Sequence, residues 1–315
     1  MSEEGGDTMV NLVAEKTRVY PPFRPYRAQV IANEQLSASF RRLTFTGDLL
    51  DRFSTDGFDQ RVKLVLPAPG EALPELGQDD DWAPESFSWH HRWRELDHCD
   101  RFPIRTYTVA EADPVARTVT IDFVIHEGGG PGSSFAERAQ PGDEIILAGP
   151  DSYSEHGPMG VDYQPGSARR ILLVADETAL PAVRSILRQS PRDVQVSALI
   201  ELPTVADALD LQACGHRVEL VLRGQERGCE LIRAVDRWCD QNLSELRRSD
   251  DTHLAPIDIN REVLWETASE VESFYAWLAG EAGVIKELRR RLVKERQVDR
   301  RQVSFMGYWR EGHVI

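Results

Sequence analysis

The first half of the chain alternates between apolar and polar residues at the two-residue period of β-strands. The alternation occurs in six runs separated by polar turns: residues 26–36, 39–50, 60–69, 104–114, 117–127 and 144–150. A short helix is expected at residues 134–139, where Pro141-Gly142 ends it. Six short strands with one small helix predict an antiparallel six-stranded β-barrel, closed or nearly closed.

The second half has a different rhythm. Continuous apolar runs, typical of strands buried on both faces, occur at residues 171–175, 194–202, 217–224, 273–280 and 303–309. Residues 180–189 are helical in pattern, and a later helix is expected to place Val284, Ile285, Leu288 and Leu292 on one face. The alternation of strands and helices predicts a parallel-sheet α/β domain with about five strands.

A chain of 315 residues exceeds the usual size of one domain. We expect a mobile polar tail at residues 1–18, a barrel domain at 19–160 and an α/β domain at 168–315, with a linker that contains Pro165-Gly166. No apolar run is long enough to cross a bilayer, and the first residues lack the features of a secretion signal. The sequence therefore predicts a cytoplasmic protein without membrane insertion.

Charge and cysteine content argue against several classes of partner and metal site. The 37 basic and 52 acidic residues give a net charge of −15, which argues against nucleic acid as a partner and requires a local basic patch for any anionic ligand. The four cysteines have no CxxC or zinc-like spacing, so reduced thiols are expected. His90, His91 and His98 follow three aspartates, but their spacing favours a solvated loop. No metal site is predicted.

The clearest chemical motif is Arg105-Thr106-Tyr107-Thr108. On a strand, Arg105 and Tyr107 share one face. The guanidinium can pair with a diphosphate, the aromatic ring can pack on a flat ring, and the hydroxyl of Thr108 can reach that ring's edge. Taken alone, the motif is more often cross-strand packing with a solvated arginine.

A glycine- and serine-rich segment follows on the next predicted strand and helix. Gly132, Ser133 and Ser134 stand where a helix begins, and free N–H groups at that position favour an anion. The alternative is a capping box formed by Ser134 and Glu137. Together the two motifs favour a cofactor with a diphosphate, while His126 is as consistent with a structural role as with a ligand contact.

Two loops of the second half stand at the carboxyl ends of predicted strands, where open α/β sheets bind ligands. The first contains Asp176, Glu177 and Thr178, and the second contains Gly280 and Glu281. No G-x-G-x-x-G occurs at the first loop, and ordinary loop chemistry explains each equally well.

The chain resembles the siderophore-interacting proteins, flavin-dependent ferric-siderophore reductases within the ferredoxin-reductase-like flavoproteins. The resemblance covers residues 26–312 and rests on motifs in the same order: DQRVKLVLP, RTYTV, DFVIH, GPGSS, PGDEIILAGP, ADETALPAV, WLAGEAGVIKELRRRL and SFMGYWREG. It implies an FAD-binding barrel followed by an NAD(P)H-binding domain.

The resemblance also implies roles for the residues. The RTYT string, His126 and the Gly132-Ser133-Ser134 segment would bind FAD, with Arg105 on a phosphate and Thr108 near the flavin N5. Asp176, Glu177, Thr178, Gly280 and Glu281 would line the pyridine-nucleotide site. Lys63 and Arg310 would bind the anionic siderophore. No residue is expected to act as a catalytic acid, base or nucleophile.

The implied reaction transfers electrons from NADH or NADPH through FAD to a ferric siderophore and releases Fe(II) in the cytoplasm. Two alternatives remain open: a general NAD(P)H:flavin oxidoreductase or ferredoxin-linked reductase, and a flavin-free carrier of ferric siderophore. Three features depart from the family pattern or bear on the donor. Ala110 replaces an arginine found in many relatives, residues 236–262 form a long polar segment that could cover the nucleotide cleft, and Glu201 favours NADH by charge.

Overall fold

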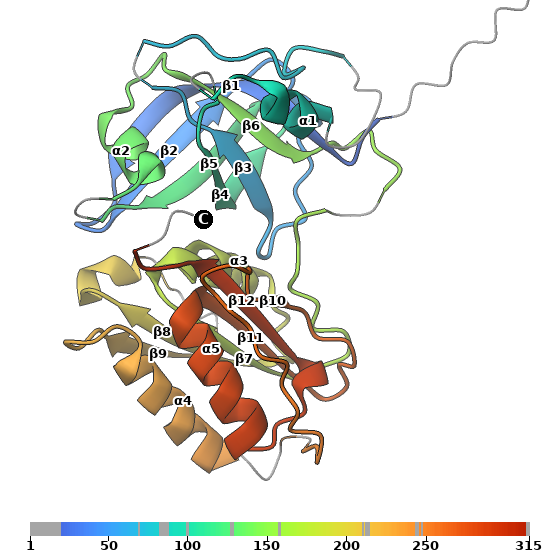
Figure 1. Cartoon of the computed structure of the whole chain (residues 1–315), viewed down its shortest axis with the longest axis vertical. Coiled ribbons are helices and arrows are strands. Elements are labelled where there is room, and N and C mark those ends of the chain that lie inside the picture. Colours follow the sequence, from blue (N-terminus) through green and yellow to red (C-terminus); the bar gives the residue numbers. More distant parts are fainter. Residues whose placement is uncertain are drawn as a thin grey trace, which may run out of the picture.

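The computed structural model describes residues 20–312 except 69, 82–87, 99–100, 127–128, 157–158, 210, 212–214, 243–245 and 247. The predicted tail at residues 1–18 lies outside the described residues, as do Cys99 and Cys214. The two halves of the chain form two domains, a barrel above an α/β domain in the view of Figure 1.

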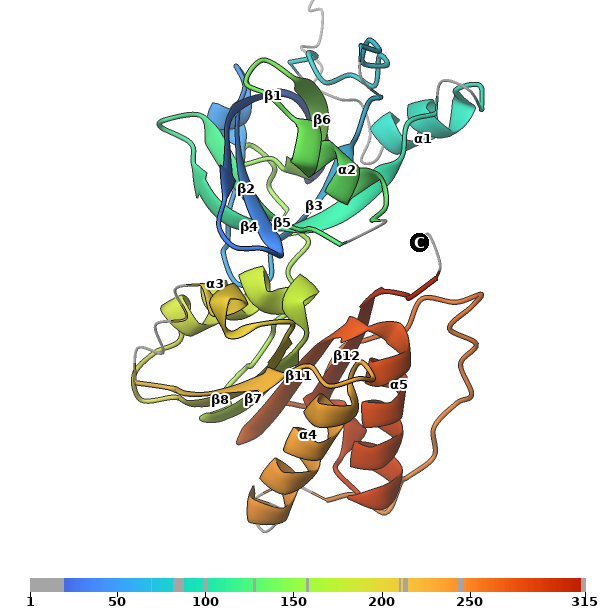
Figure 2. The same ribbon diagram turned by 90° about the vertical axis from the view of Figure 1, so that its left-hand side faces the viewer.

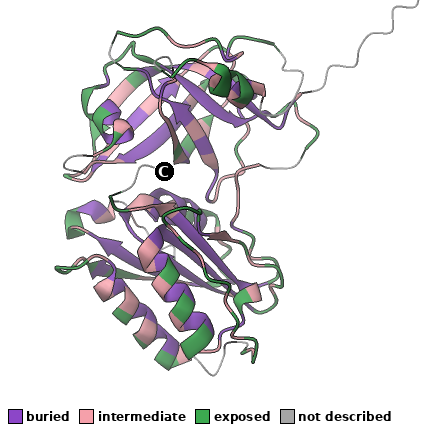
Figure 3. Cartoon of the chain, viewed as in Figure 1, coloured by how far each residue is buried: buried purple, intermediate pink, exposed green. Residues whose placement is uncertain are grey.

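The first half forms the predicted closed antiparallel barrel, in the order β1-β2-β5-β4-β3-β6. Its strands are β1 (Phe23–Gln35), β2 (Phe40–Thr46), β3 (Arg61–Val65), β4 (Ile104–Asp113), β5 (Thr118–Val124) and β6 (Glu144–Pro150). Inward-facing residues such as Leu43, Phe45 and Ile121 fill the barrel. Figure 3 shows buried residues, in purple, along the strands of the barrel.

Two helices accompany the barrel. Helix α2 (Pro131–Arg138) begins three residues before the predicted start. Helix α1 (Ser88–Glu95) lies in a segment that we expected to be a solvated loop. It buries Trp89 with Leu76, Phe102 and Val65 in a small second core on the outer surface of the barrel.

The second half forms a six-stranded sheet in the order β10-β12-β11-β7-β8-β9. The five predicted strands are all present and parallel: β7 (Arg170–Ala175), β8 (Gln195–Leu202), β9 (Arg217–Leu222), β11 (Phe274–Glu281) and β12 (Val303–Trp309). The sixth strand, β10 (Trp265–Glu266), is antiparallel to β12. Five parallel strands confirm the predicted fold class, and β10 makes the sheet mixed.

Helices cover both faces of this sheet (Figures 1 and 2). Helix α3 (Leu180–Gln189) packs on the face toward the barrel, whereas α4 (Cys229–Asn242) and α5 (Ala282–Arg290) pack on the other. Helix α5 continues into a π-helical turn at Arg291–Glu295. The first residues of the polar 236–262 segment belong to α4, which the sequence analysis missed although its buried residues recur at helical spacing: Leu231, Ala234, Val235, Trp238 and Cys239.

The same segment then returns along α5. The side chain of Lys286 donates a hydrogen bond of 2.8 Å to the Ile257 carbonyl, and Arg289 binds the Ala255 carbonyl at 3.4 Å. Leu254, Ile257 and Ile259 pack against the core beneath α4 and α5. These contacts place residues 254–259 against α5.

Apolar and polar contacts join the barrel to the second domain. Phe40 of the barrel is fully buried in the core that also contains α3. The buried carboxylate of Asp122 on β5 pairs with Arg42 of its own domain at 2.7 Å and with Arg184 of α3 at 3.0 Å. Asp207 accepts a hydrogen bond of 2.6 Å from the hydroxyl of Ser37.

A second buried carboxylate ties the linker to both domains. Asp59, which precedes β3, accepts hydrogen bonds from the backbone N–H groups of Asp162 and Tyr163 at 3.1 and 3.0 Å. It also accepts the indole N–H of Trp277 on β11 at 3.2 Å. The predicted boundaries at 19–160 and 168–315 stay predictions, while the barrel strands and the sheet strands fall within them.

Candidate functional site

The RTYT motif lies on β4 as predicted. Arg105 and Tyr107 stand opposite Leu64 and Val62 of β3, and the Tyr107 ring packs on Phe123 of β5 with ring centres 4.3 Å apart. Thr108 is buried, whereas Thr106 is exposed. Strand pairing therefore fixes the backbone of the motif.

The first turn of α2 lies beside this strand. The helix begins at Pro131 with Gly130 as its N-cap, and no side chain among the described residues caps it. The capping box proposed for Ser134 is therefore wrong, because Ser134 lies inside the first turn and its N–H binds the Gly130 carbonyl at 3.1 Å. The first N–H groups of an uncapped helix are open to an anion.

Gly132 brings the helix backbone against the tyrosine of the motif. A Cβ atom at this position would lie 1.9 Å from the Tyr107 hydroxyl, closer than any real contact allows. The side-chain hydroxyl of Ser133 accepts the His126 N–H at 3.3 Å and so connects the helix to the end of β5. The two motifs that the sequence analysis combined are thus adjacent, and an aromatic side chain beside uncapped N–H groups fits a flavin with a diphosphate.

His126 connects this region to the second domain. Its ring is partly buried and stacks on Trp309, at the end of β12, with ring centres 5.7 Å apart. Burial lowers the pKa of His126, and the nearby Arg227 and Arg223 lower it further while Glu177 opposes them. The structure shows a packing role at the domain boundary, and a ligand contact stays a prediction.

The two predicted nucleotide loops meet in space. The order of strand connections reverses between β7 and β11, since β8 and β9 follow β7 on one side of the sheet and β12 follows β11 on the other. Asp176 follows β7 and Glu281 is the last residue of β11, and the Asp176 carboxylate accepts the Glu281 N–H at 2.8 Å. Open α/β sheets bind ligands at such a switch point.

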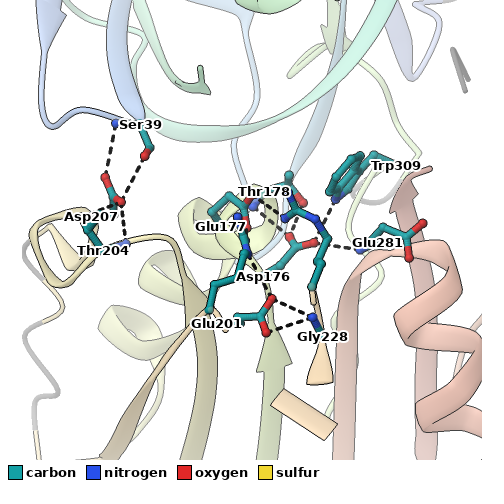
Figure 4. A network of polar contacts seen from close by, with 12 residues as sticks. Ser39, Asp176, Glu177, Thr178, Glu201, Thr204, Asp207, Gly228, Glu281 and Trp309 are labelled. Atoms are coloured by element: carbon teal, nitrogen blue, oxygen red, sulfur yellow. Dashed lines mark hydrogen bonds and ion pairs between the residues drawn. The ribbon is translucent and has the colours of Figure 1, made fainter. Parts of the chain in front are cut away.

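Asp176 is the centre of this meeting point (Figure 4). Its carboxylate also accepts the N–H and hydroxyl of Thr178 at 2.9 and 2.6 Å and the indole N–H of Trp309 at 2.9 Å. A Cβ atom at Gly280 would lie 2.8 Å from this carboxylate, so only glycine permits the approach. Burial raises the pKa of Asp176 to about 6, with a further rise from Glu177.

This raised pKa predicts a pH-dependent contribution to stability. An acid whose pKa rises on folding stabilises the fold below its unfolded pKa and loses that contribution as the pH passes the folded value. From below pH 3.8 to above about 6, that is over roughly pH 3 to 7, the free energy of unfolding of the wild type should fall by about 3 kcal/mol relative to Asp176→Asn. Urea denaturation of both proteins across this range measures the difference, and parallel pH profiles would contradict it.

Two buried glutamates, Glu177 and Glu201, lie near Asp176 (Figure 4). Both pair with arginines that the sequence analysis did not single out. Glu177 pairs with Arg223 and, at 2.9 Å, with Arg227. Glu201 pairs with Arg223 at 3.3 Å and accepts the Gly228 N–H at 3.0 Å. Glu201 is fully buried with its charge already compensated, which argues against its expected role as a ribose acceptor that favours NADH.

Trp309 also escaped the sequence analysis. Besides its bond to Asp176 and its stack with His126, the guanidinium of Arg227 lies 4.7 Å from the centre of its ring. In the sequence it is the last residue of the apolar run 303–309 and part of the SFMGYWREG motif, but many buried tryptophans also stand at the end of a strand.

The two residues predicted to bind the substrate have different surroundings. Lys63 on β3 is partly buried and donates to the Thr106 hydroxyl at 3.2 Å, and burial lowers its pKa, with a smaller contribution from Arg61. Arg310 pairs with Glu281 at 2.9 Å, so part of its charge is already compensated. No contact between Lys63 and Arg310 is found in the described structure.

Other predictions concerned metals, thiols and membranes. Among the described residues, no group of histidine, cysteine and carboxylate side chains could hold a metal ion. The ring of His90 stacks on Trp93 within α1 instead. Cys229 and Cys239 are free thiols. No helix in the part of the chain that the structure describes is long and apolar enough to cross a membrane.

Comparison with protein families gives two matches that cover most of the chain. The family model described as the siderophore-interacting FAD-binding domain matches residues 29–154, and that described as siderophore-interacting protein matches residues 168–312. The chain is 28% identical to an NADPH-dependent ferric-chelate reductase of Escherichia coli over 93% of this chain and 95% of that protein. It is 30% identical to an uncharacterized protein of Mycobacterium bovis over 92% of each.

Solved structures agree. A siderophore utilization protein from T. fusca is 29% identical, with a TM-score of 0.66 over 95% of this chain and 97% of that one. The ferredoxin reductase of carbazole 1,9a-dioxygenase shares the fold alone, at 15% identity and a TM-score of 0.58 over 91% of this chain and 70% of that one. The barrel and sheet thus have the ferredoxin-reductase-like arrangement.

Proposed function

This chain belongs to the siderophore-interacting protein family, and from that premise we propose that it is a flavin-dependent reductase of ferric siderophores. Electrons pass from NADPH through FAD to Fe(III), and Fe(II) is released in the cytoplasm. The named E. coli relative, which reduces ferric chelates with NADPH, supports both the reaction and the donor.

The observation that carries the proposal is the uncapped first turn of α2 beside the Tyr107 ring. The N–H groups of Gly132 and Ser133 suit the flavin diphosphate, and Arg105 on the neighbouring strand supplies a guanidinium for the same phosphates. Such an arrangement is less expected in a flavin-free carrier, which needs no diphosphate site.

The residues of the chain act by binding and orientation. When bound, FAD would supply the redox chemistry that links a two-electron donor to the one-electron reduction of Fe(III). The Fe(II) formed binds hard oxygen ligands more weakly than Fe(III) does, so it leaves the siderophore more easily. The Arg105 and Tyr107 side chains and α2 would hold the flavin. The loops of Asp176 and Glu281 would hold the pyridine nucleotide at the switch point of the sheet. No proton transfer from a protein side chain is required.

Purified protein tests this proposal directly. We expect a flavin absorption spectrum that bleaches on anaerobic addition of NADPH and returns when a ferric siderophore is added, with Fe(II) captured by a ferrous chelator. A colourless protein that binds ferric siderophore would support the carrier. Bleaching by NADPH followed by electron delivery to free flavin or ferredoxin, without Fe(II) formation, would support a general reductase instead.

Lys63→Ala should weaken binding of an anionic ferric chelate. Lys63 stands opposite Thr106 of the RTYT motif, so its loss removes a cation from the strand that pairs with this motif. We expect the KM for the chelate to rise several-fold while flavin stays bound. Arg310→Ala should have a smaller effect because Arg310 is paired with Glu281. Lys294→Ala is the control, because Lys294 is an exposed lysine in the π-helical turn after α5. An unchanged KM in Lys63→Ala would contradict the assignment of Lys63 to the substrate site.

A further inference from the structure

We infer that Arg223 determines the preference for NADPH by cancelling the charge of Glu201 at the nucleotide site. The inference rests on the proposed function, since it concerns the donor of that reaction. It assigns donor preference to a cation that comes from the end of β9, rather than to the acid at the end of β8.

The position of Glu201 is the starting point. Strand β8 lies beside β7 in the sheet, and Glu201 stands near its carboxyl end, one strand away from Asp176. In dinucleotide-binding folds an acid near this position accepts the ribose hydroxyls of NADH, and its charge repels the 2′-phosphate of NADPH. An uncompensated Glu201 would therefore disfavour NADPH.

The contacts of Glu201 remove that effect. Both carboxylate oxygens face the Gly228 N–H, at 3.0 and 3.1 Å, and one oxygen accepts from the Arg223 Nε at 3.3 Å. The Glu201 side chain is 1% exposed, whereas that of Arg223 is 16% exposed. A ligand that approaches this end of the sheet meets the guanidinium before the carboxylate.

The neighbouring charges make Arg223 the decisive partner. Glu177 has two arginines, because Arg227 pairs with it at 2.9 Å and Arg223 reaches it as well. In the described part of the chain, Arg223 is the only cation that forms an ion pair with Glu201. Arg227 still pairs with Glu177 when Arg223 is removed, whereas Glu201 loses its ion-pair partner and its negative charge is left uncompensated.

The test compares kcat/KM for NADPH and NADH with the flavin-loaded protein. Arg223→Ala should lower the NADPH/NADH ratio about tenfold, as expected for one unit charge within several ångström of the 2′-phosphate at the effective dielectric constant of a partly buried site. Arg223→Lys should keep most of the preference. Arg223→Ala combined with Glu201→Gln should restore the ratio, because the double variant again lacks the uncompensated charge.

Glu201→Gln alone keeps the test informative if Arg223→Ala fails to fold. This change removes one of the two carboxylates that pair with Arg223, so the positive charge at the site increases and the NADPH/NADH ratio of kcat/KM should rise. Arg237→Ala, which removes an exposed arginine of α4 that pairs with Glu219, is the control for loss of a positive charge from the same domain. A ratio that is unchanged in Arg223→Ala, or not restored in the double variant, would overturn the inference.

The outcomes separate the inference from the function on which it rests. Wild-type protein that oxidises neither nucleotide would refute the proposed reductase. Wild-type protein that oxidises NADPH, with an Arg223→Ala variant that loses activity equally toward both nucleotides, would leave the reductase in place and refute only the role of Arg223.

Discussion

Gly132→Ala should abolish stable flavin binding while leaving the barrel folded. The added Cβ would lie 1.9 Å from the Tyr107 hydroxyl, so the tyrosine or the first turn of α2 must move. The Tyr107 ring cannot shift freely, because it packs on Phe123 inside the barrel end. Movement of the helix would displace the N–H groups that are proposed to bind the diphosphate. We expect at least a hundredfold loss of FAD affinity, on the order of 3 kcal/mol.

Gly130→Ala is the matched control. Gly130 has a negative φ of −67°, and a Cβ atom there would meet nothing within 4 Å. The flavin-to-protein ratio of both variants after purification, followed by titration of the apoprotein with FAD, measures the effect. Full flavin occupancy in Gly132→Ala would show that this close approach has no part in cofactor binding.

Asp59→Ala should destabilise the protein by about 3 kcal/mol. The Asp59 carboxylate is fully buried and satisfies two linker N–H groups and the indole N–H of Trp277, which is itself fully buried. Alanine would leave these donors without their acceptor, and each buried unsatisfied donor costs about 1–3 kcal/mol. Release of the cost of burying the charge, which raises the pKa of Asp59, offsets part of the loss.

Urea denaturation monitored by tryptophan fluorescence checks this expectation. Asp59→Asn retains an oxygen for the linker N–H groups and should lose less stability than Asp59→Ala. Asp193→Ala removes a carboxylate that is 70% exposed in a 3.9 Å pair with Arg169, and it should change the free energy of unfolding by less than about 0.5 kcal/mol. Equal effects of Asp59→Ala and Asp193→Ala would contradict the role of the buried carboxylate.

Local patterns were enough to predict most of the fold. The period of two in residues 104–114 and the continuous apolar runs at residues 171–175 and 273–280 reflect burial on one face or on both. Both patterns involve residues that are neighbours along one strand, so they can be recognised in the sequence. Helix α1 was missed because its one buried contact, Trp89, packs on the outside of a barrel strand, where no local period indicates a second core.

The candidate site was predictable only in its separate pieces. Residues of the RTYT strand and of α2 are close in sequence, and the structure brings them together as expected. The charge balance around Glu201 was not predictable, because its partners Arg223 and Gly228 approach through the loop after β9. A single acid at a strand end suggested a preference for NADH, whereas the contacts made through folding neutralise it.

The burial of Phe40 within the core of the second domain has a consequence for how such proteins evolve. A barrel transplanted onto a foreign partner would present a bare phenyl ring, together with an Asp122 that had lost Arg184. If two distantly related proteins of the family recombined at the linker, the chimaera should aggregate unless both sides of this domain interface came from the same parent. Successful exchange of domains would require transfer of α3 together with the start of β2, which carries Phe40, and with β5, which carries Asp122.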